Sequence, residues 1–355
     1  MKRKFVIGLA LVTGLLLALC ACSAESATKQ NTTPVVTQDS VPETKQVTEP
    51  FVEPSPSSAM PTSIATEFEP FSLEVMEHEV TYTKVPEKVI SLNLHTTENL
   101  IALGLEDKII GTAYTNAEVL PEYADIFNKI PKIAEQYPSW EVLVEADPDF
   151  VIGRNSAFGE KGVTAISDFL DSGIMVYVPI ETYTPGSTIE ATYEDFRNLG
   201  RIFNVEEKAE AIINEMQGKV EGVAEKISGN TEKLRVFVYD AGDDQAFTSG
   251  QSLESNLIDL AGGENIFNDI EKTWSNVSWE EIVNRNPQVI VINDYGETTA
   301  QEKIDFLLAK PGLSEVDAIK NNHFVVLQLP TIFTGIRNGD AVEILAKGFY
   351  PDLFK

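Results

Sequence analysis

Hydrophobic residues follow two different spacings along this chain, and each spacing predicts a different kind of element. Short continuous apolar runs alternate with stretches in which apolar residues recur every three or four positions. Continuous runs are typical of strands in parallel sheets, because crossover helices cover both faces of such a sheet. The pattern therefore predicts an α/β fold with mostly parallel sheets. The predicted strands are 89–92, 109–112, 150–152, 175–178, 236–239, 289–292 and 324–327.

The longest uninterrupted helical pattern spans 204–227. Apolar residues recur there from Val205 to Ile227, Asn204 can cap the start, and a Ser-Gly-Asn segment at 228–230 can end the helix. At about 1.5 Å per residue, such a helix is roughly 34 Å long, the width of a small domain. We predict that a helix over 204–228 joins two lobes, 73–203 and 229–355. An ordinary surface helix of a single domain is the alternative.

An internal repeat supports two similar lobes. Residues 139–152 align without a gap with residues 278–291, and both segments read as a serine cap, a short helix, a proline turn and an apolar strand. The alignment places Glu141 and Glu280 in equivalent first turns. Acidic residues there also favour the helix dipole by about 0.3–1 kcal/mol, which is the simpler explanation for either residue alone. In the second copy, Ser278 and Glu281 match a capping box, which would leave Glu280 free to point outward.

The first 72 residues carry export signals in place of a folding pattern. Residues 1–22 combine a basic start, a short apolar run and a small-residue exit, which predicts a signal peptide. Residues 19–22 resemble the bacterial lipobox, with Cys22 as the lipidated residue; a plain secretory signal with incidental cysteines is the alternative. Residues 23–72 are rich in Thr, Ser, Pro, Glu and Gln, so we predict a disordered tether. The sequence contains 2 cysteines, both in the signal, so the folded part has no disulfide.

Charge and motifs exclude several classes of function. The net charge of −28 argues against nucleic acid and against a basic membrane-binding surface. The sequence lacks the nucleophile elbow, the phosphate-binding glycine loop and the paired-histidine zinc motif, so we expect no enzyme and no resident cofactor. Its 3 histidines disfavour a binder of free Zn²⁺ or Mn²⁺, and we expect no protein-bound metal.

Together these segments resemble the solute-binding lipoproteins of ABC importers that take up ferric siderophores, haem or cobalamin. The resemblance covers nearly all of 72–355. It implies two Rossmann-like lobes joined by one long α-helix, with the ligand in a cleft between them. It also implies that one acidic residue per lobe, here Glu141 and Glu280, pairs with arginines of the permease. The segments that carry the resemblance are 85–92, 98–105, 109–111, 141 with 147–149, 247–250, 262–267, 279–280 and 316–320.

Candidate ligand contacts follow the carboxyl ends of the predicted strands, where open α/β sheets leave a crevice. By the resemblance, Tyr114 and Trp274 stand where cobalamin binders place ring-contacting aromatics; covering the core is the alternative for any single aromatic. We expect His95 to be a hydrogen-bonding wall residue. Arg337 lies at the start of the last predicted helix, where the helix dipole disfavours a positive charge. It therefore needs an anionic partner, from the ligand or from a protein carboxylate. The full candidate set is Asn93, His95, Tyr114, Tyr137, Arg154, Tyr239, Asp240, Trp274, Phe333 and Arg337.

The sequence therefore predicts a monomeric, lipid-anchored protein on the extracytoplasmic face of the cell membrane. Its partners would be a small-molecule metal chelate and the permease and ATPase subunits of an ABC importer. Only Arg154 and Arg337 are credible cleft cations, which disfavours a triply charged catecholate complex. A hydroxamate siderophore is slightly favoured, with haem and cobalamin as alternatives. A surface receptor or adhesion module without transport is the competing class of function.

Overall fold

The computed structural model describes residues 68–230 and 232–355, which belong to one compact unit. The predicted signal peptide 1–22 with Cys22, and the predicted tether up to residue 67, lie outside the described residues.

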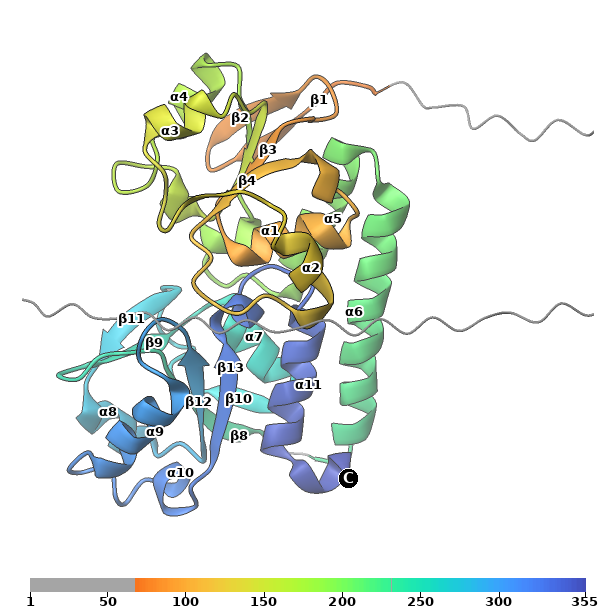
Figure 1. The fold of residues 1–355 in the computed structure, drawn as a ribbon. Helices are drawn as coiled ribbons and strands as arrows, with labels where there is room; N and C mark the ends of the chain where they lie inside the picture. The colour runs from red at the N-terminus through yellow and green to blue at the C-terminus, as the bar shows by residue number, and fades with distance from the viewer. Residues whose placement is uncertain (1–67, 231) are drawn as a thin grey trace, which may run out of the picture. The chain divides into compact units, whose positions relative to one another are not determined.

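The N-terminal lobe contains a five-stranded parallel sheet in the order β5-β4-β3-β6-β7 (Figure 1). Its strands are β3 (Val89–Ser91), β4 (Ile109–Ala113), β5 (Lys132–Ala134), β6 (Phe150–Ile152) and β7 (Met175–Tyr177). Its helices are α1 (Leu94–Ala102), α2 (Ala124–Phe127), α3 (Trp140–Glu145), α4 (Ile166–Asp171) and α5 (Ile189–Phe203).

The C-terminal lobe repeats this plan with four parallel strands in the order β10-β8-β12-β13. In each lobe the first strand lies between the second strand and a later one, so both sheets reverse their strand order beside the first strand. The third strand lies beyond the second in the N-terminal lobe and on the opposite side of the first in the C-terminal lobe. The strands are β8 (Leu234–Tyr239), β10 (Gly263–Asn265), β12 (Val289–Asp294) and β13 (Phe324–Gln328), with an antiparallel pair of β9 (Ala246–Ser249) and β11 (Trp274–Val277) beside them. The helices are α7 (Leu253–Leu260), α8 (Trp279–Arg285), α9 (Ala300–Ala309), α10 (Asp317–Lys320) and α11 (Asn338–Phe349).

Short 3-10 helices connect several of these elements. They are η1 (Glu106–Lys108), η2 (Pro121–Tyr123), η3 (Asn155–Ala157), η4 (Ile180–Thr182), η5 (Leu329–Ile332) and η6 (Pro351–Phe354). The two-lobe α/β architecture predicted from the hydrophobic pattern is confirmed.

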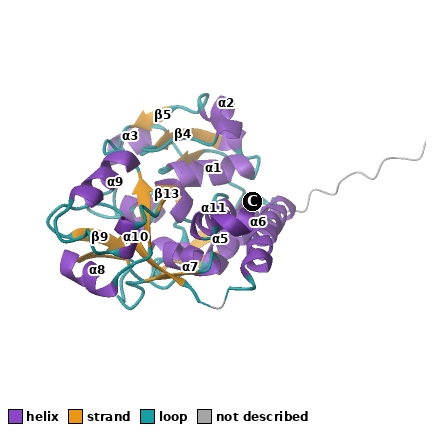
Figure 2. Cartoon of the chain, turned by 90° about the horizontal axis from the view of Figure 1, so that it is seen from below, coloured by secondary structure: helices purple, strands orange, loops and turns teal. Residues whose placement is uncertain are grey.

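The long helix joins the lobes as predicted but begins later. It is α6 (Glu206–Ile227), and Asn204 ends the preceding helix α5 in the left-handed conformation (φ 56°, ψ 47°). The predicted N-cap role of Asn204 is therefore wrong, because asparagine also tolerates the left-handed position that ends a helix. Helix α6 packs against α5 of the first lobe and against α7 and α11 of the second (Figure 2).

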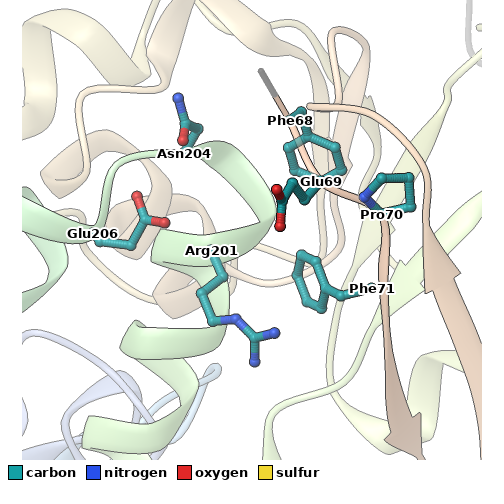
Figure 3. A pocket seen from close by; sticks show the side chains of 7 residues that line it. All are labelled: Phe68, Glu69, Pro70, Phe71, Arg201, Asn204 and Glu206. Carbon is teal, nitrogen blue, oxygen red and sulfur yellow. The ribbon is translucent and has the colours of Figure 1, made fainter. Parts of the chain in front are cut away.

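The folded body includes residues before the predicted boundary at 73. An antiparallel hairpin of β1 (Phe71–Val75) and β2 (His78–Tyr82) precedes the first sheet. Phe68 and Phe71 pack against the core, and the guanidinium carbon of Arg201 lies 4.1 Å from the centre of the Phe71 ring. Figure 3 shows these side chains around a surface cavity of about 550 Å³ at the junction of α5 and α6. Aromatic burial therefore extends the folded body toward the N-terminus.

The core consists of two hydrophobic clusters that meet at the second sheet. The first cluster runs through the N-terminal lobe and α6 and includes Val236 and Val238 of β8. The second contains Phe237 and Tyr239, which point to the opposite face of the same strand. Both faces of the C-terminal sheet are thus buried, and the first cluster connects the lobes.

Candidate ligand-binding site

Each lobe has one point where the strand order reverses, and a polar bridge lies at each. In the N-terminal lobe the backbone N–H of Arg154, after β6, donates to Oδ1 of Asn93, after β3, at 2.9 Å. In the C-terminal lobe the hydroxyl of Tyr295, after β12, donates to Oδ2 of Asp240, after β8, at 2.6 Å. Loops leave such points in opposite directions and form a crevice, so both sites are suited to bind a ligand.

A small cavity lies where the two lobes meet. Its lining combines residues of the N-terminal lobe with the η5 segment of the C-terminal lobe. The cavity measures about 10 Å³, which is room for one water molecule. The lobes are therefore closed on each other, and a larger ligand requires them to separate. The lining residues are Asn93, Leu94, His95, Tyr114, Asn116, Arg154, Leu329, Pro330 and Phe333.

Phe333 packs against a cation and an imidazole from the opposite lobe. The guanidinium carbon of Arg154 lies 3.8 Å from the centre of its ring, and the ring of His95 lies 5.2 Å away. Burial, reinforced by the charges of Arg154 and Arg337, lowers the pKa of His95 well below its ordinary value, so its imidazole is neutral. Nε2 of His95 and Nε of Arg154 are buried and have no hydrogen-bond partner within the described residues. A ligand could satisfy both atoms.

Two tyrosines form a further wall of the N-terminal half. Tyr114 follows β4 with a φ of 52°, and its ring meets Tyr137 edge-on with 4.8 Å between centres. The hydroxyls of Tyr137 and Ser156 are hydrogen-bonded at 2.8 Å, and Nδ2 of Asn93 donates to the hydroxyl of Tyr137 at 3.4 Å. The wall is therefore linked to the polar bridge between Asn93 and Arg154.

Asp240 belongs to a buried polar network of the C-terminal lobe. Nζ of Lys303 donates to the backbone carbonyl of Asp240 at 2.7 Å, and Nδ2 of Asn293 donates to its Oδ1 at 3.3 Å. Burial raises the pKa of Asp240, while hydrogen bonds from Tyr295 and Asn293 and the charges of Lys303 and Arg154 oppose that rise. Arg154 thus acts on Asp240 from the opposite lobe.

Arg337 is held by a protein carboxylate, one of the two partners that the sequence left open. Its Nε donates to Oε2 of Glu98 at 2.7 Å and its Nη2 to Oε1 at 2.5 Å. The Arg337 and Glu98 side chains are 6% and 1% exposed. Arg337 thus forms a buried ion pair between the lobes, its contact with a ligand stays a prediction, and Arg154 is the cation in the cavity lining.

Two predicted aromatic contacts do not line the cavity. Tyr239 is 3% exposed, stacks on Phe306 with 6.1 Å between ring centres, and donates its hydroxyl to the carbonyl of Gly242. Tyr239 therefore belongs to the core, because its strand position points it away from Asp240. Trp274 stacks on Phe247 at 5.6 Å in the β9–β11 pair, so it packs on its own lobe.

The periplasmic binding protein family model matches residues 89–330 of this sequence. The chain belongs to the periplasmic binding protein family. A Bacillus subtilis (strain 168) relative, described as an uncharacterized ABC transporter substrate-binding lipoprotein, is 29% identical over 297 residues, which cover 82% of this chain and 88% of the relative. A vitamin B12-binding protein of Pectobacterium carotovorum is 28% identical over 215 residues, 59% of this chain and 71% of the relative.

Solved structures give the same family. A periplasmic binding protein from Veillonella parvula superposes with a TM-score of 0.74 at 28% identity, covering 79% of this chain and 98% of its own. These relatives are named for binding or for transport.

The repeated serine-capped helices of this periplasmic binding protein expose a glutamate at the same position in each lobe. Glu141 in α3 and Glu280 in α8 are each the second residue of their helix, and both are exposed. A hydrogen bond from its own backbone N–H, and then one from Ser139, lower the pKa of Glu141. The predicted capping box at Ser278 is half formed: Ser278 accepts from the backbone N–H of Glu281, but the Glu281 carboxylate pairs with Arg285.

Sequence reasoning missed two residues of the site. Tyr295 follows a strand in the same way as Asp240, so the rule that selected Asp240 could have found it. Glu98 lies in a helix that also contains His95, two threonines and Asn99, so its sequence surroundings give no signal that it is buried.

The described ranges lack two kinds of feature. They contain no group of three or more His, Cys, Asp or Glu side chains placed to hold a metal ion. None of the helices found there combines the length and apolarity needed to cross a membrane.

Proposed function

We propose that this periplasmic binding protein is the substrate-binding component of an ABC importer and that it captures a compact organic metal complex between its lobes. Its family and the B. subtilis relative named as an ABC transporter lipoprotein support this class of function. The observation that carries the proposal is the pair of polar switch points, one in each lobe, that flank an aromatic cavity at the lobe boundary.

The charges of this cavity favour a cargo with little net charge. Arg337 is committed to Glu98, and the charge of Arg154 is opposed by Asp240. A triply charged catecholate complex requires several converging cations, and these are lacking among the lining residues. A neutral or cationic ferric hydroxamate suits this balance. Cobalamin is the second candidate, supported by the B12-binding relatives, and haem remains an alternative.

Cargo capture requires a change in lobe separation. A cavity of about 10 Å³ cannot hold a siderophore or a corrin ring, whose sites measure hundreds of cubic ångströms. Helix α6 packs on both lobes and the first core cluster connects them, so the motion is a small rocking rather than a wide hinge. The observed arrangement of the lobes would then be a closed form.

Delivery would use the exposed glutamates and a lipid anchor. Glu141 and Glu280 would dock on arginines of the permease, one per lobe, and the ATPase cycle would then separate the lobes. Cys22 would anchor the monomeric protein at the extracytoplasmic face of the membrane, and the residues after it would serve as the tether. The relative described as a lipoprotein supports the anchor.

A double substitution tests delivery separately from binding. Glu141→Arg with Glu280→Arg should abolish uptake of ferrioxamine or cobalamin by cells while affinity for the same compound stays within a few fold. Glu190→Arg with Glu221→Arg is the matched control: it changes the net charge equally, on the exposed faces of α5 and α6. Normal uptake by the first variant would refute docking through these residues. Uptake that is unchanged in cells lacking this protein would favour the receptor or adhesion module without transport.

A further inference from the structure

The buried pair of Glu98 and Arg337 also holds a third segment, the loop over 114–120. Oε1 of Glu98 accepts a hydrogen bond from the backbone N–H of Leu120 at 2.8 Å. Nη2 of Arg337 donates to the backbone carbonyl of Glu118, also at 2.8 Å. One ion pair thus joins α1, the loop after β4 and the segment that leads into α11 of the other lobe.

This loop forms part of the cavity wall. Tyr114 and Asn116 both line the cavity between the lobes. Tyr114 has a φ of 52°, a backbone conformation that a bulky residue adopts only where its surroundings hold it. The contacts of Leu120 and Glu118 lie at the far end of the same short loop, so the ion pair is positioned to hold the wall in place.

The pair is fully satisfied, which makes its geometry specific. Besides its contacts to Glu98 and Glu118, the Arg337 guanidinium donates from Nη1 to Oε1 of Gln328 at 3.0 Å. Asn99, the next residue in α1, binds the same C-terminal segment: its Nδ2 donates to the carbonyl of Thr334 and its Oδ1 accepts from the N–H of Ile336, each at 3.1 Å. A buried network with all members paired holds one arrangement, whereas a partly paired one is costly.

We propose that Glu98 and Arg337 are positioning residues that couple the separation of the lobes to release of the 114–120 wall. When the lobes part, Arg337 moves away with the C-terminal lobe and withdraws its support from Glu118. Leu120 then depends on a buried carboxylate that has lost its counter-ion. The wall loosens, and the cargo loses the Tyr114 contact as the cleft opens. The coupling to cargo rests on the proposed function; the coupling to the loop does not.

Hydrogen exchange of the full-length, cargo-free protein in detergent tests the coupling to the loop. Arg337→Met should make the amide of Leu120, which donates to Glu98, exchange about tenfold faster, because the loop that carries it loses the hydrogen bond between Arg337 and the Glu118 carbonyl. The matched control is Thr192→Val. It breaks another buried contact between the lobes, the 2.8 Å hydrogen bond from Thr192 to Asn338, which touches neither Glu98 nor the loop. This control should leave exchange in the loop unchanged.

The variant Glu98→Met with Arg337→Met separates positioning from stability. Replacing both buried charges by apolar side chains should restore most of the urea midpoint lost in Arg337→Met, because no unpaired charge remains. The loop should still exchange faster, since neither methionine can bind Leu120 or Glu118. Wild-type loop protection in this variant, or an equal loss of protection in Thr192→Val, would overturn the proposal.

Cargo dissociation provides the functional readout. With ferrioxamine or cobalamin as the probe, whichever binds the wild type, the double methionine variant should release it about tenfold faster, with association little changed. An unchanged dissociation rate together with a loosened loop would refute the coupling to cargo. If the wild type binds neither probe, the proposed function fails on its cargo, and the exchange experiment still decides the coupling between lobes and loop.

Discussion

The carboxyl group of Glu254 should give the protein a measurable dependence of stability on pH. Glu254 lies in α7 and is 1% exposed. Its Oε1 has no hydrogen-bond partner in the described ranges, and its Oε2 is 3.5 Å from Nδ2 of Asn293. Burial, and then the charge of Asp240, raise the pKa of Glu254 from 4.5 to about 8. The folded protein therefore retains a proton that the unfolded chain releases.

The size of the effect follows from this difference in pKa. Between about pH 4.5 and pH 8 the unfolded chain binds fewer protons than the folded protein, so the free energy of unfolding falls as pH rises. Each pKa unit corresponds to about 1.4 kcal/mol, so the free energy of unfolding that is lost above pH 8 is at most about 5 kcal/mol. We expect about 2–4 kcal/mol, because relaxation around a buried charge reduces its desolvation cost. Asp195 and Glu181, with pKa values raised by burial to about 8 and about 7, contribute in the same direction.

Glu254→Gln tests this reasoning. The glutamine keeps the shape of the side chain, cannot ionise, and can donate to Oδ1 of Asn293, which also has no partner among the described residues. In urea unfolding, the variant should exceed the wild type by about 2–4 kcal/mol at pH 8 and by almost nothing at pH 4.5. Glu264→Gln, at an exposed position in β10, is the control and should match the wild type at both pH values. A variant that is less stable at pH 8, or equally stabilised at both pH values, would refute the account.

Three further substitutions test packing. Gly335→Ala should lower the free energy of unfolding by about 1–3 kcal/mol, because its Cβ would lie 2.9 Å from Oδ1 of Asn99. Gly218→Ala in α6 should raise it by about 0.5–1 kcal/mol, because a Cβ there meets no atom within 4 Å. Urea unfolding measures both, and a destabilised Gly218→Ala would contradict the packing of α6. Tyr239→Phe should lower the free energy of unfolding by about 1 kcal/mol, because the hydrogen bond to the Gly242 carbonyl is lost, and should leave cargo affinity unchanged. A lower cargo affinity in this variant would show that Tyr239 belongs to the binding site.

Local patterns predicted the central strands of both parallel sheets, but not β5 and β10, whose three-residue sequences contain no continuous apolar run. A run such as 289–292 is apolar at every position because both faces of its strand are buried, and this signal does not depend on the rest of the fold. The repeat of a serine cap, a glutamate and a proline turn can also be recognised from neighbouring residues alone. It placed Glu141 and Glu280 at matching positions of α3 and α8, where the structure has them.

Other features depend on choices that the sequence alone does not make. Asn204 can begin a helix or end one, and only the packing of α5 against α6 selects the second role. Tyr239 and Asp240 are consecutive, and Tyr239 packs in the core while the Asp240 carboxylate accepts hydrogen bonds from Asn293 and Tyr295. The register of β8 in the sheet decides which of the two side chains faces the core, and the identity of a single residue does not reveal that register.

The partner of Arg337 illustrates the remaining limit. The sequence shows that a cation at the start of the last helix needs an anion, but 239 positions separate Arg337 from Glu98. Many carboxylates in so acidic a chain could satisfy it, and only the arrangement of the two lobes selects Glu98. This selection also changes the functional conclusion, because it removes one of the two cations available to the cargo.

The most direct test of the account is a calorimetric titration of the full-length protein in detergent with four compounds: ferrioxamine, cobalamin, haem and a ferric catecholate. We expect ferrioxamine or cobalamin to bind. At a free concentration of a hundred times its dissociation constant, the bound compound should raise the free energy of unfolding by about 2.7 kcal/mol. Arg154→Met should weaken that binding at least about tenfold, the effect of losing a charged hydrogen bond. Exclusive binding of the triply charged catecholate, or an affinity that does not depend on Arg154, would contradict a cavity at the lobe boundary that selects cargo of low charge.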